Sequence, residues 1–133
     1  MKFYVLFLLV LLLIGCNKES PTEQGNQKLN EPFELKIGDS AVLDHGTLNF
    51  SFDSVSSDNR CPENSFCYDL GDAAVVIKHS NSFYTFHTNK ETKSMTIGIY
   101  HIELLSLLPY PKSSDPIPAS SYIAKFMVTK SIL

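Results

Sequence analysis

The stretch Val75-Val76-Ile77-Lys78-His79-Ser80-Asn81-Ser82-Phe83-Tyr84-Thr85-Phe86 decides the fold, because it has the pattern of two strands joined by a tight turn. Apolar residues recur at every second position on both sides of the turn, which is the period of a strand and not of a helix. With Ser80-Asn81 as a two-residue loop, the core-facing partners are Val75 with Phe86 and Ile77 with Tyr84. The alternative is a turn longer by one or two residues, because asparagine suits a left-handed turn position better than serine does.

The same period of two continues on both sides of this hairpin. It predicts strands near 33–37, 40–43, 47–55, 73–79, 83–88, 95–107 and 122–129. Turns are expected at Gly38-Asp39 and His45-Gly46, and a Pro, Ser and Asp-rich loop is expected at 111–118. The residues expected to face inward are Leu48, Phe50, Phe52, Tyr100, Ile102, Leu104, Tyr122, Ala124, Phe126 and Val128. We therefore predict an all-β domain of six to seven strands, either an antiparallel β-sandwich or a small barrel, with no helix.

The length and composition are those of one ordinary globular domain. The chain has 133 residues, of which 44% are hydrophobic and 19% charged, and its formal net charge is −3. The lysines and arginines are scattered and form no cluster, whereas binding to phosphate backbones needs clustered positive charge. Nucleic acid is therefore not expected as a partner.

The first residues have the pattern of an export signal. Lys2 is followed by an unbroken apolar run over 3–14, which is too short to span a bilayer. Its end, Leu13-Ile14-Gly15-Cys16, resembles the lipobox of bacterial lipoproteins. The resemblance implies cleavage before Cys16, a thioether-linked diacylglycerol on its sulfur and an acylated, palmitate-type amino terminus. The alternative is an ordinary signal peptide that happens to hold a cysteine.

The domain organisation follows from this reading. We expect a signal peptide over 1–15, the lipidated Cys16 with a polar, flexible tether over 16–32, and a β-rich domain over 33–133. Asn17 follows the lipidated position, where an aspartate would resemble an inner-membrane retention signal. The expected location is therefore the bacterial cell envelope, anchored by lipid in the outer membrane.

Cys61 and Cys67 are the two cysteines left once Cys16 is lipidated. An even pair in an exported, oxidising setting favours a disulfide, and Pro62 and Asn64 favour the turn that would close it. A redox-active pair usually has two intervening residues, and a zinc site would need two further ligands. We expect a structural disulfide.

Charged residues crowd this same stretch and make it the candidate binding loop: Asp58, Arg60, Glu63, Asp69 and Asp72. Together with Asp53, the four carboxylates of this set offer the oxygen ligands that calcium prefers, but the spacing is not that of a calcium loop. Solvated turn residues are therefore expected, with Arg60 pairing one carboxylate.

No catalytic or metal-binding pattern stands out. The four histidines, His45, His79, His87 and His101, lack any HxH or HExxH spacing, and no GxSxG motif is present. Two carboxylates could serve glycoside hydrolysis, but nothing singles out a pair. We predict no catalytic residue, no metal ligand, no cofactor and no enzyme.

The central stretch resembles that of a group of uncharacterised bacterial lipoproteins, which carry Asp-Ser-Arg-Cys-Pro, a second cysteine, a glycine and a small residue opening a strand. The matching residues here are Asp58, Arg60, Cys61, Pro62, Cys67, Gly71 and Ala73. The likeness extends over most of 48–130, through 98–104, 108–111 and 122–124. Asn59 stands where the group has the serine, and Tyr68-Asp69-Leu70 stand where the group often has an aliphatic residue, Trp and Ala. The resemblance implies a β-rich lipoprotein domain and supplies no activity.

These observations lead to one main hypothesis and two alternatives. The main one is a lipid-anchored, non-enzymatic envelope protein that presents a rigid β domain to an unknown protein partner or for a structural role. The first alternative is an inhibitor of an envelope hydrolase, a lysozyme or a protease, acting through the 61–67 ring. The second alternative is a metal-binding protein.

Overall fold

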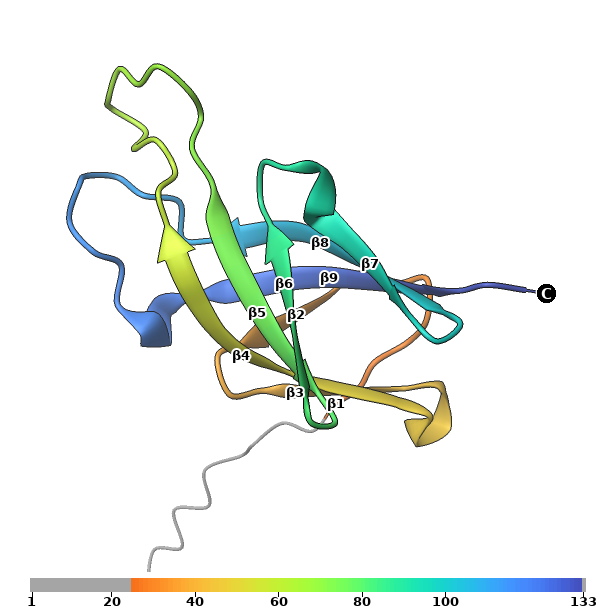
Figure 1. The fold of residues 1–133 in the computed structure, drawn as a ribbon. Coiled ribbons are helices and arrows are strands. Elements are labelled where there is room, and N and C mark those ends of the chain that lie inside the picture. The colour runs from red at the N-terminus through yellow and green to blue at the C-terminus, as the bar shows by residue number, and fades with distance from the viewer. Residues whose placement is uncertain (1–24, 133) are drawn as a thin grey trace, which may run out of the picture.

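The computed structural model describes residues 25–132, in which two β-sheets pack against each other (Figure 1). One sheet has the order β1-β3-β4-β5-β6 and the other the order β2-β9-β8-β7. The strands are β1 Gly25–Asn26, β2 Phe33–Lys36, β3 Ser40–Leu43, β4 Leu48–Asp58, β5 Ala73–His79, β6 Ser82–His87, β7 Ser94–Ile97, β8 Tyr100–Leu108 and β9 Ile123–Lys130. Every pairing is antiparallel except that of β1 with β3. The fold is a β-sandwich and not a closed barrel, which decides between the two predicted alternatives.

The hairpin formed by β5 and β6 has the predicted register. Val75 pairs with Phe86 and Ile77 with Tyr84, and Ser80-Asn81 forms the two-residue turn. Ser80 takes the left-handed conformation, with φ of 53°. The longer turn that asparagine favoured is therefore not formed.

The core lies between the sheets and is built by the predicted inward faces. Phe126 of β9 is at its centre, with ring centroids of Phe50, Phe52 and Phe86 between 5.6 and 6.5 Å away. All ten residues predicted to face inward on β4, β8 and 122–128 are buried. The contacts between aromatic rings cross from one sheet to the other, and they hold the two layers together.

The predicted strand 95–107 is wrong, because the structure divides it into β7 and β8. Ile97 pairs with Tyr100, and Gly98-Ile99 forms the turn between them. Gly98 has φ of 60°, which glycine adopts without a steric penalty. The apolar positions change from odd numbers at Met95, Ile97 and Ile99 to even numbers at Tyr100, Ile102 and Leu104. This change of phase marked a break that the predicted single strand overlooked.

The predicted boundary between tether and domain at residue 33 is also too late. Gly25–Asn26 pairs with Ala41 and Val42, and Asn30 donates a backbone hydrogen bond to the Val128 carbonyl over 2.8 Å. Leu29 packs against the core. A single apolar residue among polar ones gave too weak a signal for an ordered segment. Residues 1–24, including Cys16, lie outside the described residues.

Short 3₁₀ turns complete the structure at Asp44–Gly46, Glu91–Lys93 and Ala119–Ser121. The first of these contains the predicted His45-Gly46 turn, and the turn at Gly38-Asp39 lies between β2 and β3. Within residues 25–132, no helix has the length and apolar character needed to cross a membrane.

Candidate functional site

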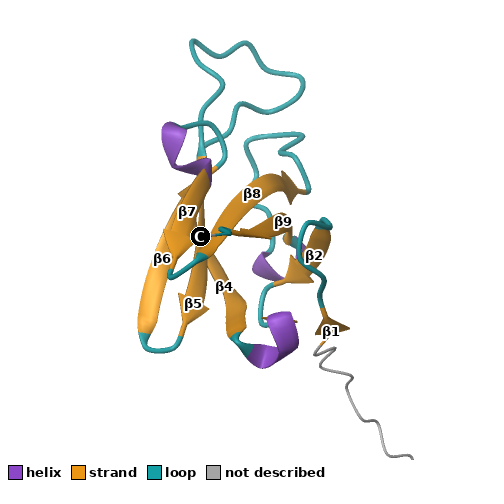
Figure 2. Cartoon of the chain, turned by 90° about the vertical axis from the view of Figure 1, so that its right-hand side faces the viewer, coloured by secondary structure: helices purple, strands orange, loops and turns teal. Residues whose placement is uncertain are grey.

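The candidate binding loop joins β4 to β5 and projects from one end of the sandwich. In Figure 1 it rises above the yellow end of β4, and β1, at the start of the described chain, lies at the opposite end of the molecule. The view in Figure 2 also places the β1 strand and the longest projecting loop at opposite ends. Register gives the same result, because Gly25 is level with Ala41 and hence with Phe50, whereas the loop begins after Asp58. The start of the described chain and the β4–β5 loop therefore lie towards opposite ends of β4.

A disulfide closes the middle of this loop. Cys61 and Cys67 are bonded, with their Cα atoms 5.9 Å apart, inside the usual range for a disulfide. Within the loop, the Ser65 N–H donates to the Pro62 carbonyl over 3.0 Å and forms a turn. The predicted disulfide is confirmed, and it ties residues 61–67 into a small ring.

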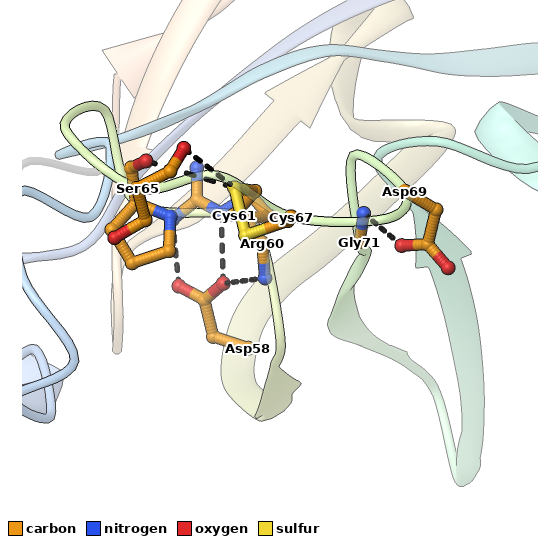
Figure 3. The surroundings of a disulfide bond; sticks show 8 residues. Asp58, Arg60, Cys61, Ser65, Cys67, Asp69 and Gly71 are labelled. Carbon is orange, nitrogen blue, oxygen red and sulfur yellow. Dashed lines mark hydrogen bonds and ion pairs between the residues drawn. A yellow bond between two sulfur atoms is a disulfide. The ribbon is translucent and has the colours of Figure 1, made fainter.

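An ion pair at the base of the loop fixes the residues before the ring. The guanidinium of Arg60 donates from Nε to Asp58 Oδ1 over 2.8 Å and from Nη2 to Asp58 Oδ2 over 2.7 Å (Figure 3). The Tyr122 hydroxyl donates to the same Oδ2 over 2.9 Å. Both charged side chains are nearly inaccessible, at 5% and 11% of their full surface for Arg60 and Asp58. The expectation that Arg60 pairs a carboxylate holds, in the bidentate form that arginine favours.

Arg60 also joins the loop to the opposite sheet. Its Nη1 donates to the Leu107 carbonyl over 2.7 Å, and its Nη2 donates to the Pro109 carbonyl over 2.9 Å. The guanidinium lies 5.0 Å from the centroid of the Tyr110 ring. Because these partners follow Arg60 by almost fifty residues, one side chain links the β4–β5 loop to the end of β8.

The contacts at the base of the loop favour the ionised form of Asp58 and the neutral form of Tyr122. Burial alone would raise the pKa of Asp58, but hydrogen bonds from Arg60 and Tyr122 outweigh it and hold that pKa below its usual value. Burial and the neighbouring Asp58 carboxylate raise the pKa of Tyr122 to about 12. Both shifts result from contacts that hold the structure together.

The residues after the ring are fixed by a second set of contacts around Asp72. Its carboxylate accepts from the Asn89 N–H over 3.0 Å and from the Thr88 hydroxyl over 3.2 Å, and His87 Nδ1 lies 2.5 Å from Oδ2. Burial alone would raise the pKa of Asp72, but the hydrogen bonds from His87 and the Asn89 N–H outweigh it and lower that pKa. The contacts join the loop to the end of β6.

Gly71 allows the two sides of the loop to approach each other closely. Its φ is 64°, and a Cβ atom at this position would lie 1.9 Å from the Asn59 carbonyl oxygen. The Asp69 carboxylate accepts from the Gly71 N–H over 2.7 Å (Figure 3). Two backbone hydrogen bonds, Asn59 N–H to Asp72 O and Cys61 N–H to Leu70 O, extend the β4–β5 ladder into the loop.

In contrast with its base, the tip of the loop exposes apolar side chains. Phe66 and Tyr68 are fully exposed and Leu70 is 68% exposed, together with the carboxylates of Glu63 and Asp69. Exposed apolar groups of this size on one short segment are typical of an interaction surface.

Two clefts lie beside this tip. One of about 620 Å³ lies between the loop and the segment 111–117, and one of about 310 Å³ lies between Leu70 and the end of β8. The smaller cleft has the more apolar lining, which includes Leu105, Leu108 and Tyr110. These three side chains are themselves partly exposed.

The five predicted loop residues therefore fall into two groups. Asp58, Arg60 and Asp72 form contacts that fix the loop, whereas Glu63 and Asp69 are exposed near its tip. Phe66, Tyr68 and Leu70 were not among the predicted binding residues. Their signal was available, since apolar residues inside a polar, disulfide-closed turn have no core to face.

The four histidines are dispersed over the described structure. His79 Nδ1 lies 2.6 Å from the Asn49 carbonyl and His87 contacts Asp72, whereas His101 lies in the other sheet beside Thr96. His45 is exposed on the turn before β4. Among residues 25–132, no group of three His, Cys, Asp or Glu side chains is arranged to hold a metal ion.

Comparison with known proteins gives no relative: no family model, no curated protein and no solved structure matches this chain.

Proposed function

We propose that this chain is a lipid-anchored, non-enzymatic protein of the bacterial cell envelope, held in the outer membrane through Cys16, which binds a protein partner through the 61–70 loop. The observation that carries the proposal is the contrast within this loop. Its backbone is held by a disulfide, by the Arg60 contacts and by the Asp72 contacts, and its tip exposes Phe66, Tyr68 and Leu70.

The 61–70 loop is already fixed before it meets a partner, and this preorganisation favours tight binding. Burying a phenylalanine or tyrosine side chain contributes about 1.5 to 3 kcal/mol, and aromatic residues are frequent binding hot spots. Ordering a mobile loop on binding would offset part of this gain. A loop that is already fixed keeps more of it, which gives the disulfide and the buried ion pair a purpose in binding.

The charged side chains of the loop support a binding role over a catalytic one. Asp58, Arg60, Asp72 and His87 contact one another or the backbone, and each contact holds the loop in place. They are engaged in structure, and the groups left at the tip are apolar rings and two solvated carboxylates.

The lipid anchor is tested separately from the binding loop. Cells that express the wild type should incorporate radiolabelled palmitate into this protein, and the Cys16→Ala variant should not. An unlabelled wild type would overturn the anchoring part of the proposal.

Binding is tested by affinity capture with the full-length chain in detergent. The double variant Phe66→Ala/Tyr68→Ala should lose a partner that the wild type retains. The matched variant Phe83→Ala, at an exposed ring on the face of β6, should retain it. A partner captured equally by all three proteins would show that the loop is not the binding surface.

Inhibition of an envelope hydrolase is the second candidate, and the projection of the loop from one end of the sandwich favours it (Figure 1). A narrow, fixed loop is the shape that fills a concave active site. Incubation with a panel of purified lysozymes and proteases tests this role. Unchanged activity across the panel would remove it.

A further inference from the structure

The charged residues around the exposed rings of Phe66 and Tyr68 indicate which kind of surface the partner presents. Glu63 and Asp69 are exposed on the loop itself, and Asp58, Asp69 and Asp115 line the larger cleft beside it. Among the described residues that line this cleft, Arg60 is the only basic one, and Asp58 neutralises it. The apolar tip therefore lies beside three carboxylates, those of Glu63, Asp69 and Asp115, and one exposed lysine, Lys112, so the charge next to it is net negative.

This charge distribution disfavours a bilayer as the target of the tip. Exposed aromatic residues can insert at a membrane surface, but such segments carry lysine and arginine, which attract anionic lipids. Carboxylates beside the rings would instead repel an anionic surface. Docking into a protein is consistent both with the charge and with a loop whose backbone is already fixed.

Resting on the function proposed above, we infer that the loop inserts Phe66 into an apolar pocket of a protein partner whose rim carries lysine or arginine side chains. Tyr68 and Leu70 contact the wall of that pocket, and Glu63 and Asp69 face its basic rim. The smaller cleft, lined by Leu70, Leu105, Leu108 and Tyr110, extends the apolar contact beyond the loop.

The inference predicts separate effects for the ring and for the carboxylates. Removing a buried aromatic anchor typically weakens binding by about 30-fold or more in Kd, mainly through faster dissociation. Removing a charge at the rim slows association, here by about threefold, and weakens its dependence on salt. Phe66→Ala should show the first effect and Glu63→Gln/Asp69→Asn the second.

The experiment begins with a photocrosslinking amino acid placed at position 66 of the full chain in its own cells, and at position 83 as the matched exposed control. The protein crosslinked at position 66 is identified by mass spectrometry and purified. Its association and dissociation rates are then measured against the full chain in detergent, at low and high salt. The chains compared are the wild type, Phe66→Ala, Phe83→Ala and Glu63→Gln/Asp69→Asn.

The expected result is a protein adduct at 66 and not at 83, with loss of affinity in Phe66→Ala and a reduced salt effect in the carboxylate variant. A phospholipid adduct at 66 would overturn the inference in favour of a membrane. A protein adduct with Kd unchanged in Phe66→Ala, or with association independent of salt, would overturn the inference and leave the proposed function standing. The absence of a protein adduct at 66 would overturn the inference, and it would overturn the proposed function as well if the wild type and Phe66→Ala/Tyr68→Ala capture the same proteins.

Discussion

At the scale of single residues, Arg60 and Gly71 hold the loop by different means. Arg60 is a buried charge satisfied by one carboxylate and by two carbonyls at the end of β8 and just after it. Gly71 has no side chain to make contacts, and its role is to leave room for the Asn59 carbonyl. Substitution at each position should therefore destabilise the protein through a different mechanism.

Arg60→Met should lower the free energy of unfolding by about 3 kcal/mol, because it leaves the Asp58 carboxylate buried without its cation. Urea denaturation measures the change. The matched control is Lys125→Met, which removes an exposed ion pair with Glu34 and should cost less than about 1 kcal/mol. Equal effects of the two substitutions would show that burial adds nothing to the Arg60 pair.

Gly71→Ala should destabilise the protein more than Gly98→Ala, although both glycines have φ near 60°. At Gly98 an added Cβ meets no atom within 4 Å, so only the backbone strain of about 1 kcal/mol applies. At Gly71 the clash with Asn59 should add about 2 kcal/mol. Thermal unfolding of the two variants measures the difference, and similar melting temperatures would contradict the predicted clash.

The sequence could indicate that Arg60 pairs a carboxylate, because acidic residues surround it. It could not identify the Leu107 and Pro109 carbonyls as partners of Arg60, or Tyr122 as a donor to Asp58, because those contacts depend on the packing of one sheet on the other. For the same reason Asp58 and Asp72 resembled members of a binding loop, and the structure shows them holding it.

At the scale of elements, the loop between β4 and β5 is fixed in two places, by a disulfide and by polar contacts. The disulfide lies within the tip, whereas the Arg60 and Asp72 contacts lie at its base. The register of the β5–β6 hairpin followed from a two-residue turn, the shorter of the alternatives that the sequence allowed. The division of β7 from β8 was missed, although the apolar positions change phase between Ile99 and Tyr100.

Cys61→Ser/Cys67→Ser should cost about 2 kcal/mol by the loop-entropy model and leave the sandwich folded. The far-ultraviolet circular dichroism should match that of the wild type, while affinity for the partner falls as the tip becomes mobile. Mass measurement of the exported wild type should show two hydrogens fewer than in the reduced form. Global unfolding of the double variant would show that the disulfide holds more than the tip.

At the scale of the whole molecule, the sandwich class followed from the inward faces of the strands, and the order of the strands did not. The sequence shows which side chains are apolar at every second position, but not that β2 joins β9 in one sheet while β3 joins β4 in the other. That choice depends on contacts between residues about ninety positions apart, such as Phe33 with Phe126.

Stability should fall in alkaline solution because of Tyr122. The folded protein raises the pKa of this phenol from 10.0 to about 12, so folding favours its protonated form. The contribution is fully present below about pH 10 and is lost as pH rises from 10 towards 12. In urea denaturation across this range, Tyr122→Phe should be less stable at neutral pH but should lose less stability than the wild type. Parallel pH curves for the two proteins would contradict this assignment.

The placement of β1, which begins at Gly25, and of the apolar loop at opposite ends of the sandwich bears on self-assembly (Figures 1 and 2). An exposed apolar patch at one end of a free molecule can lead to head-to-tail fibres, in which each copy docks onto the far end of the next. In the anchored state that we propose, all copies on one membrane stand parallel, with their Gly25 ends turned towards the lipid. The tip of one copy then cannot reach the far end of its neighbour, so attachment to the membrane would itself block polymerisation and leave the loop free for a partner of a different kind.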